Sequence, residues 1–248
     1  MDYKVVVSTC SHTYNSYKQY WDKTGLDFHY LSHKIDDKTK LDGLIFTEEN
    51  IRGDYNFDTK VSKKHYWNSF GNRNIIWFYA HLRMMYYYQF NPGHDYYWFF
   101  DDDLKVDNWD AFFKGFENNH CDFISYYGFK EASVKNQPNI PIIDDKTTST
   151  NFWFQRFPGD GDILWPDTTE YFGAFYPITR FSNKALAKLV EVTSLGLHGW
   201  HEGFVPTILN YYGMSLDTVF NNKSQAKYFD NDIVNVKHKN ETINWEWI

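Results

Sequence analysis

The chain has 248 residues, of which 42% are hydrophobic and 21% aromatic, and its formal net charge is −7 at pH 7. This length suits one α/β domain, and the acidic balance argues against nucleic acid as a partner. The 20 Tyr, 22 Phe and 10 Trp exceed what a core usually needs, so some are expected to line clefts, where flat rings suit sugars and nucleobases. A Tyr- and Phe-heavy core from an A+T-rich coding bias is the alternative explanation.

The two cysteines, Cys10 and Cys121, cannot form a disulfide framework and match no metal-binding pattern. No signal region stands at the start, and no apolar run approaches about 18 residues. These features predict a cytoplasmic protein, with peripheral contact at the cytoplasmic face of a membrane as a further expectation. No sequence feature indicates an oligomeric state.

The first part of the chain alternates predicted strands and helices. The β-branched run Lys4–Thr9 predicts a strand, and small polar residues follow it through Thr13, on the side where α/β sheets bind ligands. Thr9 is therefore a candidate ligand contact. A helix is expected over Tyr14–Trp21, and further strands over Asp27–Ser32 and Leu44–Thr47.

Helical spacing of apolar residues predicts a helix from Asn74 that stops before Asn91-Pro92-Gly93. The segment Gly71-Asn72-Arg73-Asn74 stands at its start, where free amides and an arginine can hold phosphate or a nucleobase edge. Arg73 and Asn74 are therefore candidate nucleotide contacts. An ordinary helix cap is the alternative.

The most informative stretch is Tyr96–Phe100, five aromatic residues that run directly into three aspartates. Such an apolar run predicts a strand buried on both faces, as in parallel sheets, which bind ligands beyond the carboxyl ends of their strands. Because strand side chains alternate, Asp101 and Asp103 are predicted to share one face and Asp102 the other. This D-x-D pair can bind Mg²⁺ or Mn²⁺, and the ion can neutralise a diphosphate. The alternative is a solvated acidic turn.

The middle of the chain begins with a predicted helix over Trp109–Glu117 and a strand over Cys121–Tyr127. Residues 129–169 are rich in Pro, Asn, Asp, Gly and Thr, which predicts an irregular, acceptor-facing lid or insertion. The strand Glu170–Tyr176 follows, in which the small Gly173 permits close approach by a ligand. A helix over Ser182–Val192, capped by Ser182 or Asn183, comes next.

Two histidines, a tryptophan and a glutamate stand close together in His198-Gly199-Trp200-His201-Glu202. A helix predicted over Val205–Tyr212, with Pro206 in its first turn, places Glu202 near the helix amino end, where a carboxylate is favoured. Glu202 is the candidate general base, and His201 the candidate residue that assists it or contacts the acceptor. A helix-capping role for the glutamate and a zinc site on the two histidines are the alternatives.

In this order, the features resemble the GT-A-type, nucleotide-sugar-dependent glycosyltransferases, whose hallmark is a hydrophobic strand that ends in D-x-D. The resemblance spans the first strand, the helix before the acidic strand, the D-x-D, the glycine segment, the carboxylate-bearing helix, and His238 after the extended segment Ile233–His238. It implies one α/β, Rossmann-like domain over 1–248, with a mixed, mainly parallel sheet flanked by helices. Residues 1–128 would form the nucleotide-sugar-binding half and 129–248 the acceptor-binding half.

The resemblance also implies roles for the residues. Mn²⁺ or Mg²⁺ would be held by Asp101, Asp103 and the late histidine His238, and Glu202 and His201 would be catalytic. The nucleoside-diphosphate sugar would be bound by Thr9, Arg73, Asn74, Asp101, Asp102 and Gly173. The expected reaction transfers a sugar, with inversion, to a hydroxyl of a glycan or glycolipid. Gly203 stands where an Asp would match the family better, which leaves the role of Glu202 open; a retaining enzyme would use it differently.

Two other functions remain as alternatives. A sugar-phosphate nucleotidyltransferase would normally carry a Gly-rich, basic loop after its first strand, and Ser8–Thr13 lacks one. A non-catalytic carbohydrate-binding protein would explain the aromatic content but not a glutamate at a helix start combined with a buried D-x-D strand.

Overall fold

The structure is a computed structural model that describes residues 1–34, 38–47, 49–50, 80–131, 171–195, 197, 201–219 and 236–238. Arg73, Asn74 and His198 lie outside these residues, as does 132–169, most of the predicted irregular stretch. Within the described ranges, no helix is long and apolar enough to cross a membrane.

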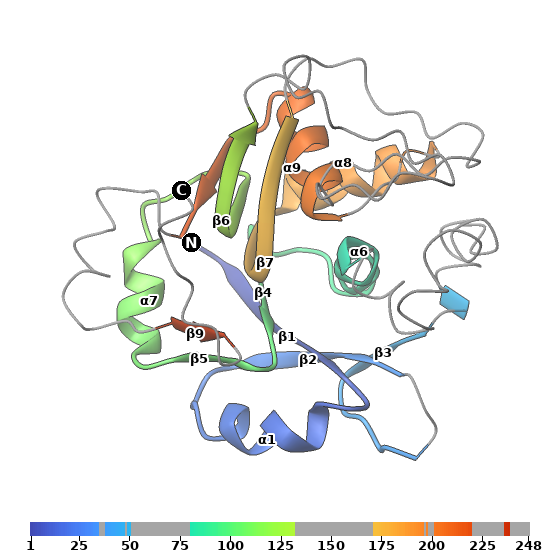
Figure 1. The fold of residues 1–248 in the computed structure, drawn as a ribbon, viewed down its shortest axis with the longest axis vertical. Coiled ribbons are helices and arrows are strands. Elements are labelled where there is room, and N and C mark those ends of the chain that lie inside the picture. The colour runs from blue at the N-terminus through green and yellow to red at the C-terminus, as the bar shows by residue number, and fades with distance from the viewer. Residues whose placement is uncertain are drawn as a thin grey trace, which may run out of the picture.

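A seven-stranded sheet forms the centre of the fold, in the order β3-β2-β1-β4-β7-β6-β8 (Figure 1). The strands are β1 (Tyr3–Cys10), β2 (Phe28–His33), β3 (Leu44–Phe46), β4 (Tyr96–Asp101), β6 (Phe123–Glu131), β7 (Tyr171–Ser182) and β8 (Leu216–Thr218). Strands β3, β2, β1 and β4 pair in parallel, β7 runs antiparallel to β4 and β6, and β8 is parallel to β6. The predicted mixed, mainly parallel sheet flanked by helices is confirmed.

Helices cover both faces of this sheet. They are α1 (Tyr14–Asp22), α6 (Ala80–Phe90), α7 (Trp109–Gly115), α8 (Asn183–Ser194) and α9 (His201–Tyr211). Figure 1 shows α6, α8 and α9 on one side of the sheet and α1 and α7 on the other. A separate two-stranded sheet joins β5 (Leu104–Val106) to β9 (Val236–His238).

Strand β4 is buried on both faces, as predicted. Tyr97 and Phe99 belong to the core cluster under α6, α8 and α9, whereas Trp98 and Phe100 belong to the cluster under α1 and α7. All four side chains are almost fully buried. Strand alternation thus explains why an uninterrupted aromatic run is needed here. Most of the described aromatic side chains lie in these two clusters, which supports the aromatic-core explanation of the composition.

Several predicted boundaries are confirmed. Helix α6 ends at Phe90, before a turn in which Gly93 has a φ of 112°, a conformation that favours glycine. Helix α8 is capped by Ser182, whose Oγ accepts a hydrogen bond from the Ala185 amide at 3.0 Å.

Other boundaries were predicted wrongly. Strand β6 continues through Glu131, because its residues pair with the start of β7, so the irregular stretch does not begin at 129. Helix α9 begins at His201 instead of Val205, which places Pro206 in the helix interior and not in its first turn. Because proline has no N–H, the Glu202 carbonyl lacks its usual helical donor at that point.

The chain order of the strands shows where the sheet has its topological switch point. From β1 the chain passes to β2 and β3 on one side, and after α6 it returns to β4 on the other side of β1. The carboxyl ends of β1 and β4 therefore flank a topological switch point, where open α/β sheets bind ligands.

Candidate functional site

The three aspartates stand at this switch point. Asp101 is the last residue of β4 and pairs in register with Ser8 of β1, while Asp102 and Asp103 form the turn before β5. The Asp102 amide donates to the Ser8 carbonyl at 3.0 Å. Since Asp103 lies in the turn beyond the strand, strand alternation does not place it on the face of Asp101, and a shared face for the two side chains stays a prediction.

Asp102 anchors the turn to α1 and β1. It is buried, and its Oδ2 accepts hydrogen bonds from the hydroxyls of Thr9 and Thr13, each at 2.5 Å. Its backbone carbonyl accepts a hydrogen bond from Trp21 Nε1 at 2.7 Å. Burial raises the pKa of Asp102, and the two hydroxyls oppose the rise. Thr9 and Asp102, predicted to contact the nucleotide, thus bind each other and hold the acidic turn against α1.

Asp101 lies on the opposite face of the sheet, toward α6, so the predicted divergence of Asp101 and Asp102 is confirmed. Its Oδ1 is 3.6 Å from Nη2 of Arg83, a residue of α6. Asp101 keeps 32% of its side chain exposed, compared with 11% for Arg83. Burial raises the pKa of Asp101 to about 7; Arg83 opposes the rise, while Asp103 and Asp102 add to it.

Sequence reasoning missed Arg83. The available signal was a single cation inside the otherwise apolar helical run, where a charge is costly unless it has a partner. A functional assignment needed the tertiary structure, because Asp101 is its partner only once α6 packs against β4.

Two further polar residues lie on the same face as Arg83. Ser8 shares a row of the sheet with Leu31 and Asp101, and His33 follows Leu31 by two residues at the end of β2. Among the residues that the structure describes, no hydrogen-bond partner meets the buried Ser8 hydroxyl, either ring nitrogen of His33 or the Arg83 Nε. We call Ser8, His33 and Arg83 the polar cluster. Buried polar groups are normally paired, so three unsatisfied side chains at a ligand edge are a sign of a binding role.

His33 is neutral in this environment. Its side chain is 1% exposed, and burial, together with the charge of Arg83, lowers the pKa of His33 to about 3. A neutral imidazole and a hydroxyl each offer one donor and at least one acceptor. The polar cluster therefore suits a ligand that carries hydroxyl groups beside an anionic group.

The predicted catalytic residues open α9. Glu202 lies in the first turn, its side chain 12% exposed, with Oε1 4.0 Å from Nε2 of His201. The Tyr176 hydroxyl of β7 donates to the His201 carbonyl at 3.0 Å, and the two rings pack edge to face. Burial, and then the charge of Glu202, raise the pKa of Tyr176. Thr207 bonds both the amide and the carbonyl of Phe172, which attaches α9 to β7.

The acidic turn and the start of α9 lie at the same edge of the sheet. Because Ile178 of β7 pairs antiparallel with Phe100, the residues of β7 that precede it, including Gly173 and Tyr176, extend past the carboxyl end of β4. Tyr176 belongs to the core cluster under α6, α8 and α9, on the face that Asp101 shares with Phe99. The structure therefore brings Asp101, Gly173 and Glu202 to the same edge, with the two carboxylates on the same face.

His238 is carried to this edge by backbone pairing. In the two-stranded sheet it lies opposite Leu104, the residue that follows Asp103. The backbone of the late histidine thus lies across from the residue that follows the D-x-D.

The residues present fit a metal ion only in part. Within the described part of the chain, no group of three or more His, Cys, Asp or Glu side chains is arranged to hold a metal ion. Asp102 is already bonded to two hydroxyls, so Asp101 and Asp103 are the two carboxylates of the acidic turn that could hold an ion. Mg²⁺ is commonly held by one or two carboxylates together with substrate phosphates, so this donor set fits an ion that binds with a diphosphate.

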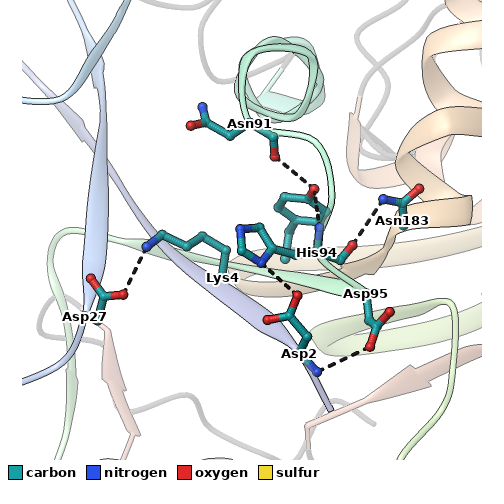
Figure 2. Close-up of polar contacts among 8 residues, drawn as sticks. Asp2, Lys4, Asp27, Asn91, His94, Asp95 and Asn183 are labelled. Carbon is teal, nitrogen blue, oxygen red and sulfur yellow. Dashed lines mark hydrogen bonds and ion pairs between the residues drawn. The ribbon is translucent and has the colours of Figure 1, made fainter.

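A surface groove of about 400 Å³ lies at the other end of β4. It is lined by Met1, Asp95, Tyr96, Glu117, His120, Ser182, Asn183 and Lys184. Figure 2 shows the polar contacts of this region, in which the Asp2 amide donates to Asp95 and the Asp2 carboxylate meets His94 Nδ1 at 3.0 Å. Asn183 Nδ2 donates to the His94 carbonyl at 3.1 Å. These contacts join the chain start to the loop before β4 and to α8, away from the acidic turn.

The raised pKa of Asp101 predicts a pH effect on stability. The folded protein holds this proton up to about pH 7, whereas the unfolded chain loses it near the ordinary value of 3.8. The free energy of unfolding of the wild type, relative to Asp101→Asn, is therefore expected to fall as pH rises from about 4 to about 7. Urea denaturation across this range measures the difference. The free energy of unfolding of Asp107→Asn, a change at an exposed position, should follow the same pH dependence as that of the wild type. If Asp101→Asn also followed the wild-type pH dependence, the raised pKa of Asp101 would be wrong.

No protein-family model matches this chain, and no curated protein matches its sequence. What the chain does is therefore inferred from the chemistry of this sheet edge.

Proposed function

We propose that this protein is a metal-dependent glycosyltransferase of the GT-A type, which moves a sugar from a nucleoside-diphosphate sugar to a hydroxyl of a glycan or glycolipid. One observation carries the proposal. Asp101 and Glu202, from distant parts of the sequence, share one edge and one face of the sheet at its topological switch point.

The donor would lie across the acidic turn and the polar cluster. Arg83 supplies a planar, cationic fork that matches phosphate oxygens, while Ser8 and His33 offer donors and acceptors to sugar or ribose hydroxyls. Asp101 and Asp103, with His238 as a further candidate, would hold Mn²⁺ or Mg²⁺. The ion, when bound, supplies positive charge that stabilises the leaving diphosphate.

Glu202 would act on the acceptor. Its carboxylate takes the proton of the acceptor hydroxyl as that oxygen forms a bond to the anomeric carbon. The bond from the anomeric carbon to the diphosphate oxygen breaks, and the nucleoside diphosphate leaves with the electron pair. Attack opposite to the leaving group inverts the anomeric configuration. His201 and Tyr176, which contact one another, position the start of α9.

A thermal-shift titration with UDP, GDP and CDP, each with and without Mn²⁺, tests the donor site. One nucleotide is expected to raise the melting temperature only with Mn²⁺; at about 100 times its Kd the gain is about 2.7 kcal/mol, or roughly 5–10 °C for a chain of this size. Asp103→Asn should abolish the shift.

The matched control is Asp107→Asn, which removes the same charge from an exposed position close by and should keep the shift. If the rise in melting temperature survived Asp103→Asn, the proposed metal site would be wrong. No shift with any nucleotide would favour a carbohydrate-binding protein or a transferase with a lipid-linked donor.

A further inference from the structure

Arg83 is a mostly buried cation with an incomplete set of partners. It lies in α6 between fully packed neighbours, and its side chain is 11% exposed. Its Nη2 is 3.6 Å from Asp101 Oδ1, which is an ion pair longer than a hydrogen bond, and within the described part of the chain its Nε has no hydrogen-bond partner. Among the described residues, Asp101 is its one ion-pair partner.

This arrangement creates a conflict when a metal ion binds. A cation held by Asp101 competes with Arg83 for the same carboxylate. If the metal holds Asp101, the mostly buried guanidinium loses its ion-pair partner, which is unfavourable. The Asp102 carboxylate also attracts Arg83, but its hydrogen bonds hold it toward α1 on the other face of the sheet. The neighbouring His33 and Ser8 are neutral and cannot replace the lost charge. An anion that arrives with the metal can, and phosphate oxygens match the arginine fork.

We propose that Arg83 couples metal binding to nucleotide binding by exchanging its partner. In the free protein with Asp101 ionised, Arg83 neutralises that carboxylate; in the complex Asp101 would hold the metal, and Arg83 would bind the diphosphate. This inference rests on the proposed function and names a binding order for the same site. Each ligand then raises the affinity for the other by the same factor, because coupling between two sites is reciprocal.

Isothermal titration calorimetry of Arg83→Gln tests the exchange. Mn²⁺ is titrated into the protein alone, and UDP, or GDP if the thermal titration selects it, is titrated with and without Mn²⁺, after correction for the metal–nucleotide complex in solution. In the wild type, Mn²⁺ should tighten nucleotide binding by about 10-fold or more.

Arg83→Gln should shift the two affinities in opposite directions. Mn²⁺ alone should bind several-fold more tightly, because its competitor is gone, whereas the nucleotide with Mn²⁺ should bind about 10- to 100-fold more weakly. Arg83→Lys keeps the charge without the planar fork, and its affinities for Mn²⁺ and for the nucleotide should lie between those of the wild type and Arg83→Gln. Lys105→Gln removes the same charge from an exposed position of β5 and should match the wild type.

The outcomes separate this inference from the proposed function. If Arg83→Gln weakens Mn²⁺ binding, or keeps the wild-type coupling, the exchange is wrong while a metal-dependent nucleotide site stands. If the wild type binds none of the nucleoside diphosphates, the proposed function and the exchange both fall.

Discussion

Glu202→Gln is expected to lower the turnover number by about 10²- to 10⁴-fold, the contribution usual for a positioned general base. Glutamine keeps the size and one carbonyl oxygen but cannot take the acceptor proton. Because Glu202 is on α9 and the proposed donor site is on β1, β4 and α6, nucleotide binding should survive. Release of nucleoside diphosphate from a panel of UDP- and GDP-sugars measures turnover, and the thermal shift measures binding.

Glu191→Gln is the matched control for this substitution. It makes the same chemical change on the exposed face of α8, where the Glu191 carboxylate pairs with Lys188. Its turnover should equal that of the wild type. If Glu202→Gln kept full turnover, Glu202 would be only a helix-capping carboxylate. If the product kept the anomeric configuration of the donor, the base role would be wrong even with turnover lost.

The second large effect is expected at Arg180, which is fully buried in β7. Its Nη2 donates to the carbonyl and Oδ1 of Asn119, each at 2.8 Å, and to the Cys121 carbonyl at 3.1 Å. Asn119 Nδ2 in turn donates to Asp217 Oδ2 at 2.6 Å, so one amide connects a buried cation to a carboxylate of β8. The Arg180 guanidinium also stacks over the ring of Tyr96.

Arg180→Met is expected to lower the free energy of unfolding by about 3–5 kcal/mol, because it removes one partner of a buried charge network and leaves the other groups unpaired. Urea denaturation measures the loss. Lys184→Met is the control: its side chain is 67% exposed and meets Asp122 at 3.7 Å, and a surface pair contributes about 0–1 kcal/mol. Equal losses for the two variants would mean that Arg180 contributes no more than a surface charge.

The Arg180 network also explains why the sheet extends to β8. Asn119 precedes β6, Arg180 lies in β7 and Asp217 in β8, so the three contacts hold the parallel pair β6–β8 next to the antiparallel pair β6–β7. A variant that breaks this network should loosen this side of the sheet, while the proposed nucleotide-binding edge at β1 and β4 keeps its own contacts. Nucleotide binding by folded Arg180→Met protein should accordingly persist.

Features that depend on neighbouring residues could be predicted from the sequence alone. The burial of β4 on both faces follows from its aromatic run, the divergence of Asp101 and Asp102 follows from strand alternation, and the cap at Ser182 follows from a hydroxyl before an apolar helical pattern. In each case the physical cause acts within a few residues along the chain. Glu202 was placed near a helix amino end for the same reason, although the helix starts earlier than predicted.

Only the tertiary structure decided the pairings between distant segments. The length of β6 and the short strands β5 and β8 depend on partners elsewhere in the chain, and three residues are too few for a periodic signal. Arg83 meets Asp101, and Thr9 meets Asp102, because parallel strands and α6 bring their ends together. The sequence by itself identified Asp101 and Glu202 as candidate site residues. Packing determined which candidates stand together and added Arg83 to them, because strand register and helix packing are set by contacts far apart in the chain.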